Sequence, residues 1–242
     1  MNALWTCRLA IVATIACQSA YSQAQNAPSD PVGVLVGRLD LETYKATIKG
    51  LTQFGDRREG TARNRAAVDW IETQLKRHGC TNTERVKYIY DQPPQPPRQA
   101  AAAARGAAIA SGEIVHGVGG SRLRGMTLPV VPNSDPDAQT DSALRARNAE
   151  LPTAGPREEV YCTKVGATRP DEMYIVGAHM DGRGFGEAAD DDGSGTALVI
   201  EMARVFSGPD VVTERSIRFA LWNNEETGLQ GSQAYVAQRA PL

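Results

Sequence analysis

The sequence has almost no net charge, few cysteines and no internal repeat. Its 26 lysines and arginines and 28 aspartates and glutamates give a formal net charge of −2 over 242 residues. This balance gives no indication of a nucleic acid or a membrane surface as a partner. The apolar fraction of 41% and the charged fraction of 22% are ordinary for a globular protein. The length suits one large domain, or a domain with an appendage.

The N-terminal apolar run, residues 9–17, is too short to cross a bilayer as a permanent helix. It follows Arg8 and precedes a stretch rich in small residues. This pattern predicts a signal peptide over residues 1–24, cleaved between Ala20 and Ala24, and therefore a secreted or periplasmic protein without a stable membrane span. A lipid anchor on Cys17 is the alternative.

Removal of this leader leaves two cysteines, Cys80 and Cys162. An oxidising compartment permits a disulfide between them, but the sequence does not show whether they lie within bonding distance. Two buried free thiols are the alternative, and the sequence favours neither.

Before the middle of the chain, apolar residues at helical spacing predict helices over residues 40–53 and 62–78, and alternation predicts a strand over residues 85–90. Thr61 is the expected N-cap of the second helix. We assign residues 25–92 to the N-terminal helical part of a catalytic domain. Residues 93–156 are rich in proline and alanine, which predicts a surface excursion with little regular structure beyond a short helix over residues 143–150.

The core of the predicted domain spans residues 157–242. Strands are expected over residues 160–165 and 173–178 as a hairpin-like pair, followed by a helix over residues 196–206 and a strand over residues 217–222. A strand–helix–strand order indicates a parallel sheet. The predicted fold class is α/β: a three-layer sandwich with a mostly parallel central sheet and helices on both faces.

Acidic and imidazole side chains follow the ends of these strands. His179 and Asp181 follow the first, Glu225 and Glu226 follow the last, and the acidic run 190–192 precedes the apolar helix. Parallel sheets bind ligands at the carboxyl ends of their strands. Carboxylates at the mouth of a buried helix need a cation or hydrogen-bond donors, and a divalent metal meets that need. A metal beside a free carboxylate provides the two groups that hydrolysis needs, an activated water and a base.

Three motifs in this order, H-x-D, D-x-x-S-G and E-E-x-G-L-x-G-S, closely resemble those of the zinc-dependent exopeptidases with two co-catalytic metals. That family includes bacterial secreted leucyl aminopeptidases and glutamate carboxypeptidase II. The resemblance covers residues 161–236, with a weaker likeness over residues 40–79.

The resemblance implies a role for each matching residue. His179 would bind one zinc, Asp191 would bridge two zinc ions, and Glu226 would bind the second. Glu225 would be the general base on the bridging water, and Asp181 would orient His179.

The resemblance also implies a cis peptide bond between Asp191 and Asp192, whereas Asp190 and Asp192 match no ligand position. The family has a further aspartate and a histidine after the glutamate pair, and neither occurs before Leu242. We therefore expect this sequence to be the front part of a longer enzyme.

The expected function is that of an exported zinc exopeptidase acting on peptides, with an aminopeptidase favoured over a carboxypeptidase. Two alternatives remain on the same scaffold. One is a single-zinc cyclase or amidase, and the other is a metal-poor, non-catalytic binding module or truncated relic. The sequence gives no prediction of oligomeric state.

Overall fold

The structure is a computed structural model that describes residues 30–91, 139–184 and 186–239. The predicted signal peptide, Cys17 and most of the predicted excursion lie outside the described residues. The chain divides into two units, residues 1–38 and 39–242. In the first unit, the short helix α2 (Pro31–Val36) begins where the Asp30 carboxylate accepts a hydrogen bond from the Val32 N–H.

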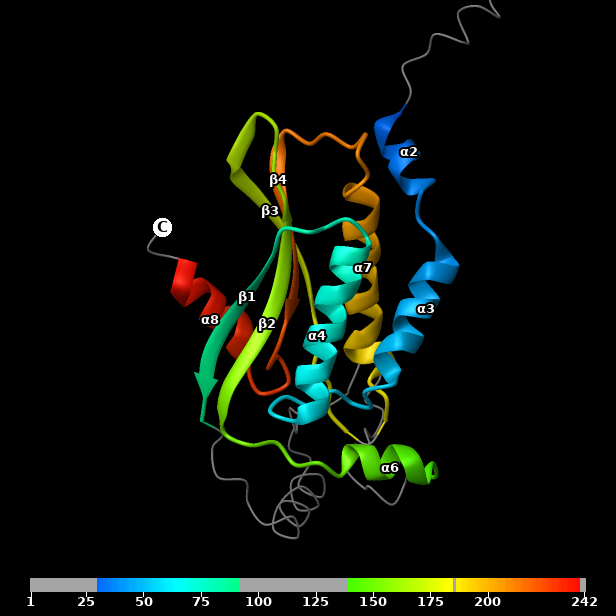
Figure 1. The fold of residues 1–242 in the computed structure, drawn as a ribbon, viewed down its shortest axis with the longest axis vertical. Coiled ribbons are helices and arrows are strands. Elements are labelled where there is room, and N and C mark those ends of the chain that lie inside the picture. Colours follow the sequence, from blue (N-terminus) through cyan, green and yellow to red (C-terminus); the bar gives the residue numbers. More distant parts are fainter. Residues whose placement is uncertain (1–29, 92–138, 185, 240–242) are drawn as a thin grey trace, which may run out of the picture. The chain divides into compact units, whose positions relative to one another are not determined.

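The second unit is built on a four-stranded sheet in the order β1-β2-β4-β3 (Figure 1). The strands are β1 (Thr83–Tyr90), β2 (Gly155–Lys164), β3 (Arg169–His179) and β4 (Arg215–Trp222). β3 and β4 are parallel, whereas β1 pairs with β2, and β2 with β4, in antiparallel fashion.

The α/β class is confirmed, but two details of the predicted sheet are wrong. One of the three described pairings is parallel, so the sheet is mixed rather than mostly parallel. β2 and β3 do not form the expected hairpin, because β4 lies between them. β4, whose residues are largely buried, pairs with both β2 and β3. The short connection between β2 and β3 therefore does not make them neighbours in the sheet.

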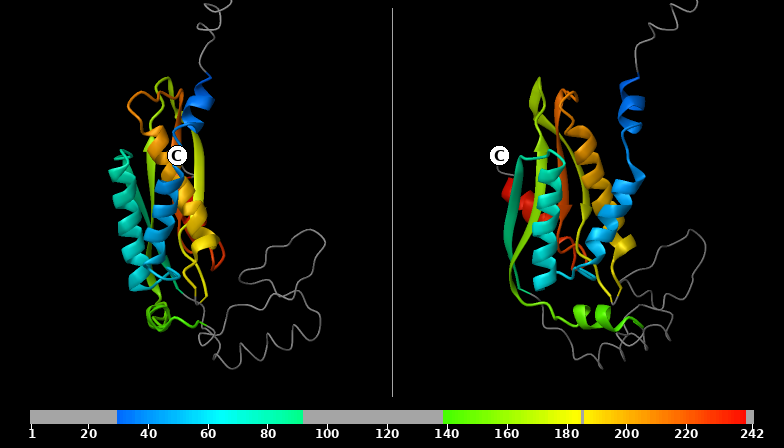
Figure 2. Two further views of the ribbon diagram at one scale, coloured as in Figure 1. Left: turned by 90° about the vertical axis from the view of Figure 1, so that its right-hand side faces the viewer. Right: turned by 45° about the vertical axis from the view of Figure 1, so that its right-hand side comes forward.

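Helices cover both faces of the sheet, as expected (Figures 1 and 2). One face carries α3 (Leu41–Thr52), α4 (Ala62–Arg77) and α7 (Gly195–Phe206), and the other carries α8 (Gln230–Arg239). The Asp40 and Thr61 side chains cap α3 and α4 by accepting hydrogen bonds from backbone N–H groups, which confirms Thr61 as an N-cap. The short helix α6 (Ser142–Asn148) confirms the element expected at residues 143–150.

Alternation along the central strands divides the core between the two faces. Val160 and Cys162 of β2 lie opposite Leu221 and Phe219 of β4 and face the three-helix layer. Tyr161, between them, packs on the other face with β1, Ala220 and the Tyr235 ring of α8. Each of the two central strands, β2 and β4, therefore provides apolar residues to both layers.

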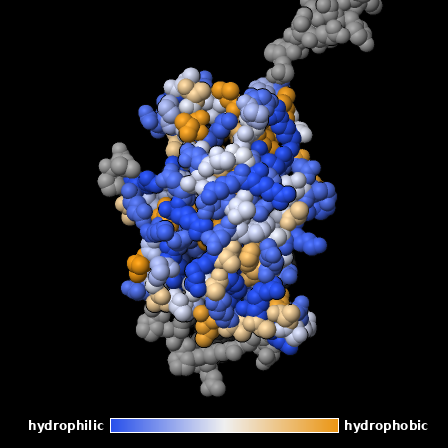
Figure 3. Space-filling view, in the orientation of Figure 1, coloured by the Kyte–Doolittle hydropathy of each residue, from blue (hydrophilic) through white to orange (hydrophobic). Residues whose placement is uncertain are grey.

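β3 is an edge of the described sheet, and its outer positions are exposed, with Tyr174 at 62% and Ile175 at 48% of their surface. The surface seen in Figure 3 is mostly hydrophilic, with hydrophobic residues in small separate patches. None of the helices in the described ranges is both long and apolar enough to cross a bilayer.

Cys80 and Cys162 form a disulfide, with Cα atoms 6.0 Å apart. It connects the segment after α4 to β2, and both residues belong to the main core cluster. Of the two alternatives that the sequence left open, the structure therefore has the disulfide.

We expect reduction of this disulfide to lower the free energy of unfolding by about 2–5 kcal/mol, because the bond constrains an unfolded chain across an 82-residue separation. Urea unfolding with and without reductant measures the difference. The double variant Cys80→Ala/Cys162→Ala is the control and should not respond to reductant. An equal response of both proteins would contradict the prediction.

Candidate active site

The parallel pairing of β3 and β4 brings the two predicted halves of the site together. His179, the last residue of β3, lies in register with Trp222, the last residue of β4, and the Met180 N–H donates to the Trp222 carbonyl over 2.8 Å. The residues that follow both strands therefore lie at one edge of the sheet, as expected.

The His179 ring lies close to Asp181, Asp191 and Glu225. Its Nδ1 lies 2.9 Å from the Asp181 carbonyl oxygen, and its Nε2 lies 3.0 Å from Asp191 Oδ1 and 3.9 Å from Glu225 Oε2. A carbonyl can only accept, so Nδ1 carries a proton and Nε2 faces the carboxylates. Burial acts to lower the pKa of His179, but the carboxylates of Asp181, Asp192 and Glu225 outweigh it and raise the pKa to about 9.

The Asp181 carboxylate connects the two strand ends. It is completely buried, and it accepts hydrogen bonds from the backbone N–H groups of Glu225 (3.1 Å) and Glu226 (3.3 Å). The atom of Asp181 closest to His179 Nδ1 is the backbone carbonyl oxygen, and the nearest carboxylate oxygen is farther away at 3.7 Å. The side chain thus positions the glutamate pair, while the main chain of the same residue orients His179.

The acidic run forms an irregular turn, η2 (Ala189–Ser194), ahead of α7. The Asp191–Asp192 peptide bond is cis, which confirms the expectation. The Asp191 carboxylate is 63% exposed and pairs with His179, whereas Asp192 accepts from the N–H groups of Gly195 (2.8 Å) and His179 (3.2 Å). Asp192, which matched no ligand position, therefore fixes the start of α7 against the end of β3.

Glu226 lies beside two other carboxylates at the candidate site. Burial, and then the negative charges of Asp191 and Asp181, raise its pKa to about 7. Close carboxylates that resist ionisation together are stabilised by a cation.

The donor atoms fit a metal ion in part. Two ligands about 2.0–2.1 Å from a tetrahedral zinc lie about 3.3 Å apart, and the His179 Nε2 and Asp191 Oδ1 atoms are 3.0 Å apart. Within the described ranges, however, no three His, Cys, Asp or Glu side chains are arranged so that they could hold a metal together. The structure thus brings the predicted ligands His179 and Asp191 into contact and places the charge of Glu226 beside Asp191, without a completed coordination shell.

Arg57, which the sequence did not predict, supports the loop between His179 and the acidic turn. Its buried guanidinium donates to the carbonyls of Met180 (2.8 Å), Glu187 (2.8 Å) and Ala188 (2.7 Å), on both sides of the loop that leads to the acidic turn. Burial lowers the pKa of Arg57 to about 10. An arginine within a turn-rich segment gives no periodic signal, so only the density of charge in residues 56–59 could have indicated it.

Glu159 and Asn223 form a second unpredicted support. Glu159 is buried, its Oε2 accepts from the Asn223 N–H over 3.2 Å, and its Oε1 has no hydrogen-bond partner among the described residues. Burial raises the pKa of Glu159 to about 8, with a smaller contribution from Asp181. The Asn223 amide also forms two reciprocal hydrogen bonds with Asn64 of α4, at 3.1 and 2.9 Å.

This combination of fold and site defines an α/β protein with an acidic, histidine-containing centre at the strand ends. Residues 160–242 match the profile of Peptidase family M28. Over this segment the expected resemblance to the zinc-dependent exopeptidases is confirmed.

The chain is also similar to named aminopeptidases. It is 45% identical over 67 residues to aminopeptidase YwaD of Bacillus subtilis, covering 28% of this chain and 14% of that protein. It is 33% identical over 117 residues to the probable lipoprotein aminopeptidase LpqL of Mycobacterium tuberculosis, covering 48% of this chain and 20% of that protein. The chain therefore spans a minor part of these relatives. The solved zinc aminopeptidase BSAP of Bacillus subtilis shares the fold with a TM-score of 0.54 at 17% identity, over 82% of this chain and 65% of that one.

We expect Asp181→Asn to lower the free energy of unfolding by about 2–3 kcal/mol, because the asparagine amide must turn a donor toward one of the two N–H groups that the buried carboxylate satisfies. Urea unfolding measures the loss, and NMR should show shifted amide signals at Glu225 and Glu226. Asp190→Asn, at an exposed carboxylate of the same site, is the matched control and should change stability by less than about 0.5 kcal/mol. Equal effects of the two variants would contradict this role of Asp181.

Glu159→Gln should remove a pH dependence of stability. Because the pKa of Glu159 is about 8 in the folded protein and 4.5 is its ordinary value, the folded state keeps a proton that the unfolded state releases between these values. The stability of the native protein should therefore fall as pH rises from 4.5 to 8. Relative to it, Glu159→Gln should gain about 1–3 kcal/mol by pH 8 and nothing at pH 4.

Urea unfolding of both proteins from pH 4 to pH 8 measures this difference. The exposed Glu187→Gln is the control and should follow the native curve. Parallel curves for native protein and Glu159→Gln would show that the carboxyl ionises normally.

Proposed function

We propose that this chain forms the metal-binding and proton-accepting part of an exported zinc exopeptidase, with aminopeptidase activity. The main support is the convergence of His179, Asp191 and Glu225 at one sheet edge, with Nε2 of the histidine facing both carboxylates. The match of residues 160–242 to Peptidase family M28 and the aminopeptidase relatives favour this reading over a binding module.

The proposed division of roles follows the donor chemistry. His179 and Asp191 would hold zinc, Asp191 would be shared with a second zinc, and Glu226 would be a ligand of that second ion. Zinc, when bound, lowers the pKa of a coordinated water and polarises the peptide carbonyl. Two zinc ions per site, and the roles of these residues, are part of the proposal.

Glu225 is the proposed general base. Its side chain is 38% exposed, so it can reach a substrate, and one oxygen lies 3.9 Å from His179 Nε2. Asp181 accepts a hydrogen bond from the Glu225 N–H and is a positioning residue. A carboxylate held in this way can take a proton from the attacking water and transfer it to the leaving amine.

Export is proposed on the predicted signal peptide, and the similarity to a relative named a lipoprotein aminopeptidase is in keeping with it. The proposed substrate is a peptide with a free N-terminus. A carboxypeptidase is the outcome if N-blocked peptides are cleaved instead.

We expect Glu225→Gln to lower kcat by roughly 10²–10⁴-fold, because it removes the proton acceptor but keeps the shape of the side chain. Hydrolysis of leucine p-nitroanilide by the protein as the cell produces it measures turnover. Elemental analysis of the same protein measures bound zinc. Zinc content should be unchanged in Glu225→Gln and reduced in His179→Ala.

Glu214→Gln, at an exposed glutamate just before β4, is the matched control and should keep native turnover. A Glu225→Gln protein with full activity would overturn the proposed base. A native protein that binds zinc and cleaves neither peptides with a free N-terminus nor N-blocked peptides would favour the binding module.

A further inference from the structure

The residue before the proposed base has an uncommon backbone conformation. Asn224 has a φ of 61°, in the left-handed region, which costs free energy for a residue with a Cβ, although asparagine tolerates it better than most. The residue is completely buried. A backbone angle of this kind persists only where surrounding contacts enforce it. The contacts of Asn224 therefore decide the direction in which the chain enters Glu225.

Tyr88 of β1 provides one of these contacts, although it lies 136 residues away in the sequence. Its hydroxyl is 3.1 Å from Asn224 Oδ1 and 3.2 Å from the Asn223 carbonyl oxygen, and it can donate its one proton to either. Burial raises the pKa of Tyr88, and the negative charges of Glu159 and Asp181 raise it further. The hydroxyl therefore keeps its proton and remains a donor at neutral pH.

The other contacts of Asn224 stay within the glutamate turn. Its Nδ2 donates to Thr227 Oγ1 over 3.0 Å, and the Thr227 hydroxyl donates to the Asn224 carbonyl over 3.2 Å. The main chain of Glu225, the next residue, is held at its N–H by Asp181 and at its carbonyl by the Gly228 N–H, over 2.8 Å. Asn224 thus connects the turn that carries Glu225 to strand β1.

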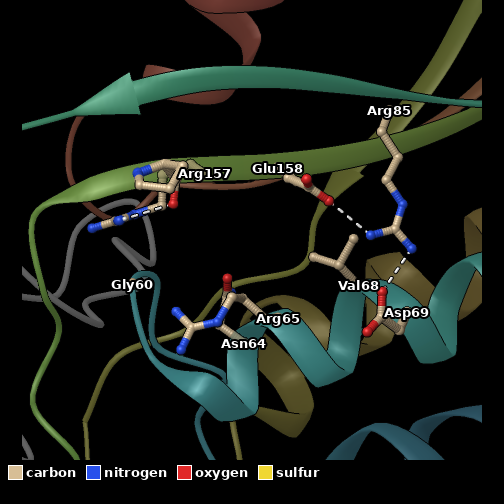
Figure 4. A pocket seen from close by; sticks show the side chains of 9 residues that line it. Gly60, Asn64, Arg65, Val68, Asp69, Arg85, Arg157 and Glu158 are labelled. Carbon is tan, nitrogen blue, oxygen red and sulfur yellow. Dashed lines mark hydrogen bonds and ion pairs between the residues drawn. The ribbon is translucent and has the colours of Figure 1, made fainter.

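The preceding residue, Asn223, is held from the side of α4. Its side-chain amide donates to Asn64 and to the Glu158 carbonyl, and both partners line a cavity of about 200 Å³ between α4 and strands β1 and β2 (Figure 4). These contacts therefore border open space. The Tyr88 ring, by contrast, packs against the buried cluster that contains Tyr161. Tyr88 thus connects the turn to a closely packed part of the core.

We propose that Tyr88 is a positioning residue for catalysis, which holds Asn224 in its left-handed conformation and so directs the Glu225 carboxylate toward the proposed metal site. This inference rests on the proposed function, because it takes Glu225 as the general base. Tyr88 does not touch the reacting atoms and acts only through Asn224. A catalytic group that is misplaced by about 1 Å can cost roughly 100-fold in rate, so a lost hydrogen bond at this position should be visible in kcat.

The test is the substitution Tyr88→Phe in the protein as the cell produces it, with leucine p-nitroanilide as the substrate. The variant keeps the ring but removes the donor to Asn224 Oδ1. We expect kcat to fall by roughly 5- to 50-fold, with KM and zinc content unchanged. NMR should show shifted signals for the Asn224 side-chain amide and the Glu225 N–H.

Tyr90→Phe is the matched control, two residues further along β1. Among the described residues the Tyr90 hydroxyl makes no hydrogen bond, so this variant should keep native kcat and leave both NMR signals in place. Equal losses of kcat in Tyr88→Phe and Tyr90→Phe would overturn the role of Tyr88. A loss of zinc together with kcat in Tyr88→Phe would also overturn it, because the residue would then support the fold of the site rather than the direction of Glu225.

Asn224→Gly supplies a second measurement. Glycine adopts a positive φ without strain and offers no side-chain oxygen to Tyr88. In this background Tyr88→Phe should lower kcat by less than about 3-fold, because the contact that it removes is already lost. The same fold loss in both backgrounds would show that Tyr88 does not act through Asn224, and would overturn the inference.

The failure of this inference differs from a failure of the proposed function. Full kcat in Tyr88→Phe, with Glu225→Gln inactive, would overturn the role of Tyr88 and leave the proposed base in place. Full activity in Glu225→Gln, or a native protein that cleaves no peptide, would overturn the proposed function and this role with it.

Discussion

The candidate site depends on one buried carboxylate. Asp181 has no solvent contact, and a buried charge is tolerated only when its oxygens are hydrogen-bonded. The two N–H groups that satisfy it belong to Glu225 and Glu226, which follow a different strand. The requirement to satisfy this charge therefore holds the two strand ends together, and with them the glutamate pair and His179.

The surroundings of Asp181 extend this constraint in two directions. On the side of β3, Arg57 satisfies carbonyls around the loop that carries the acidic turn, and Asp192 fixes that turn to the His179 backbone. On the side of β4, Glu159 and Asn64 hold Asn223, just before the glutamates. The exposed carboxylate of Asp191 and the half-exposed Glu225 then stand on a fixed base, and the concentration of negative charge is what a metal ion would balance.

The sheet order explains why residues so far apart in sequence meet here. β4 lies between β2 and β3, so its end is beside both the end of β3 and the middle of β2, where Glu159 lies. The disulfide holds β2 to the segment after α4, and Asn64 of α4 reaches Asn223 from the same layer. The support of the site thus draws on α4, β2 and β4 together.

The sequence by itself predicted most of the elements and the polar residues of the candidate site. Helical and alternating spacing located α3, α4, α7 and the strands, Thr61 indicated the cap of α4, and motif order indicated His179, Asp181, Asp191, Glu225 and Glu226. These signals are local, since they depend on residues within a few positions of one another. Only the tertiary structure decided the mixed sheet, the Cys80–Cys162 pairing and the roles of Arg57, Asp192 and Glu159. Strand order, disulfide pairing and the satisfaction of buried charges depend on which distant segments meet, and no local pattern in the sequence specifies that.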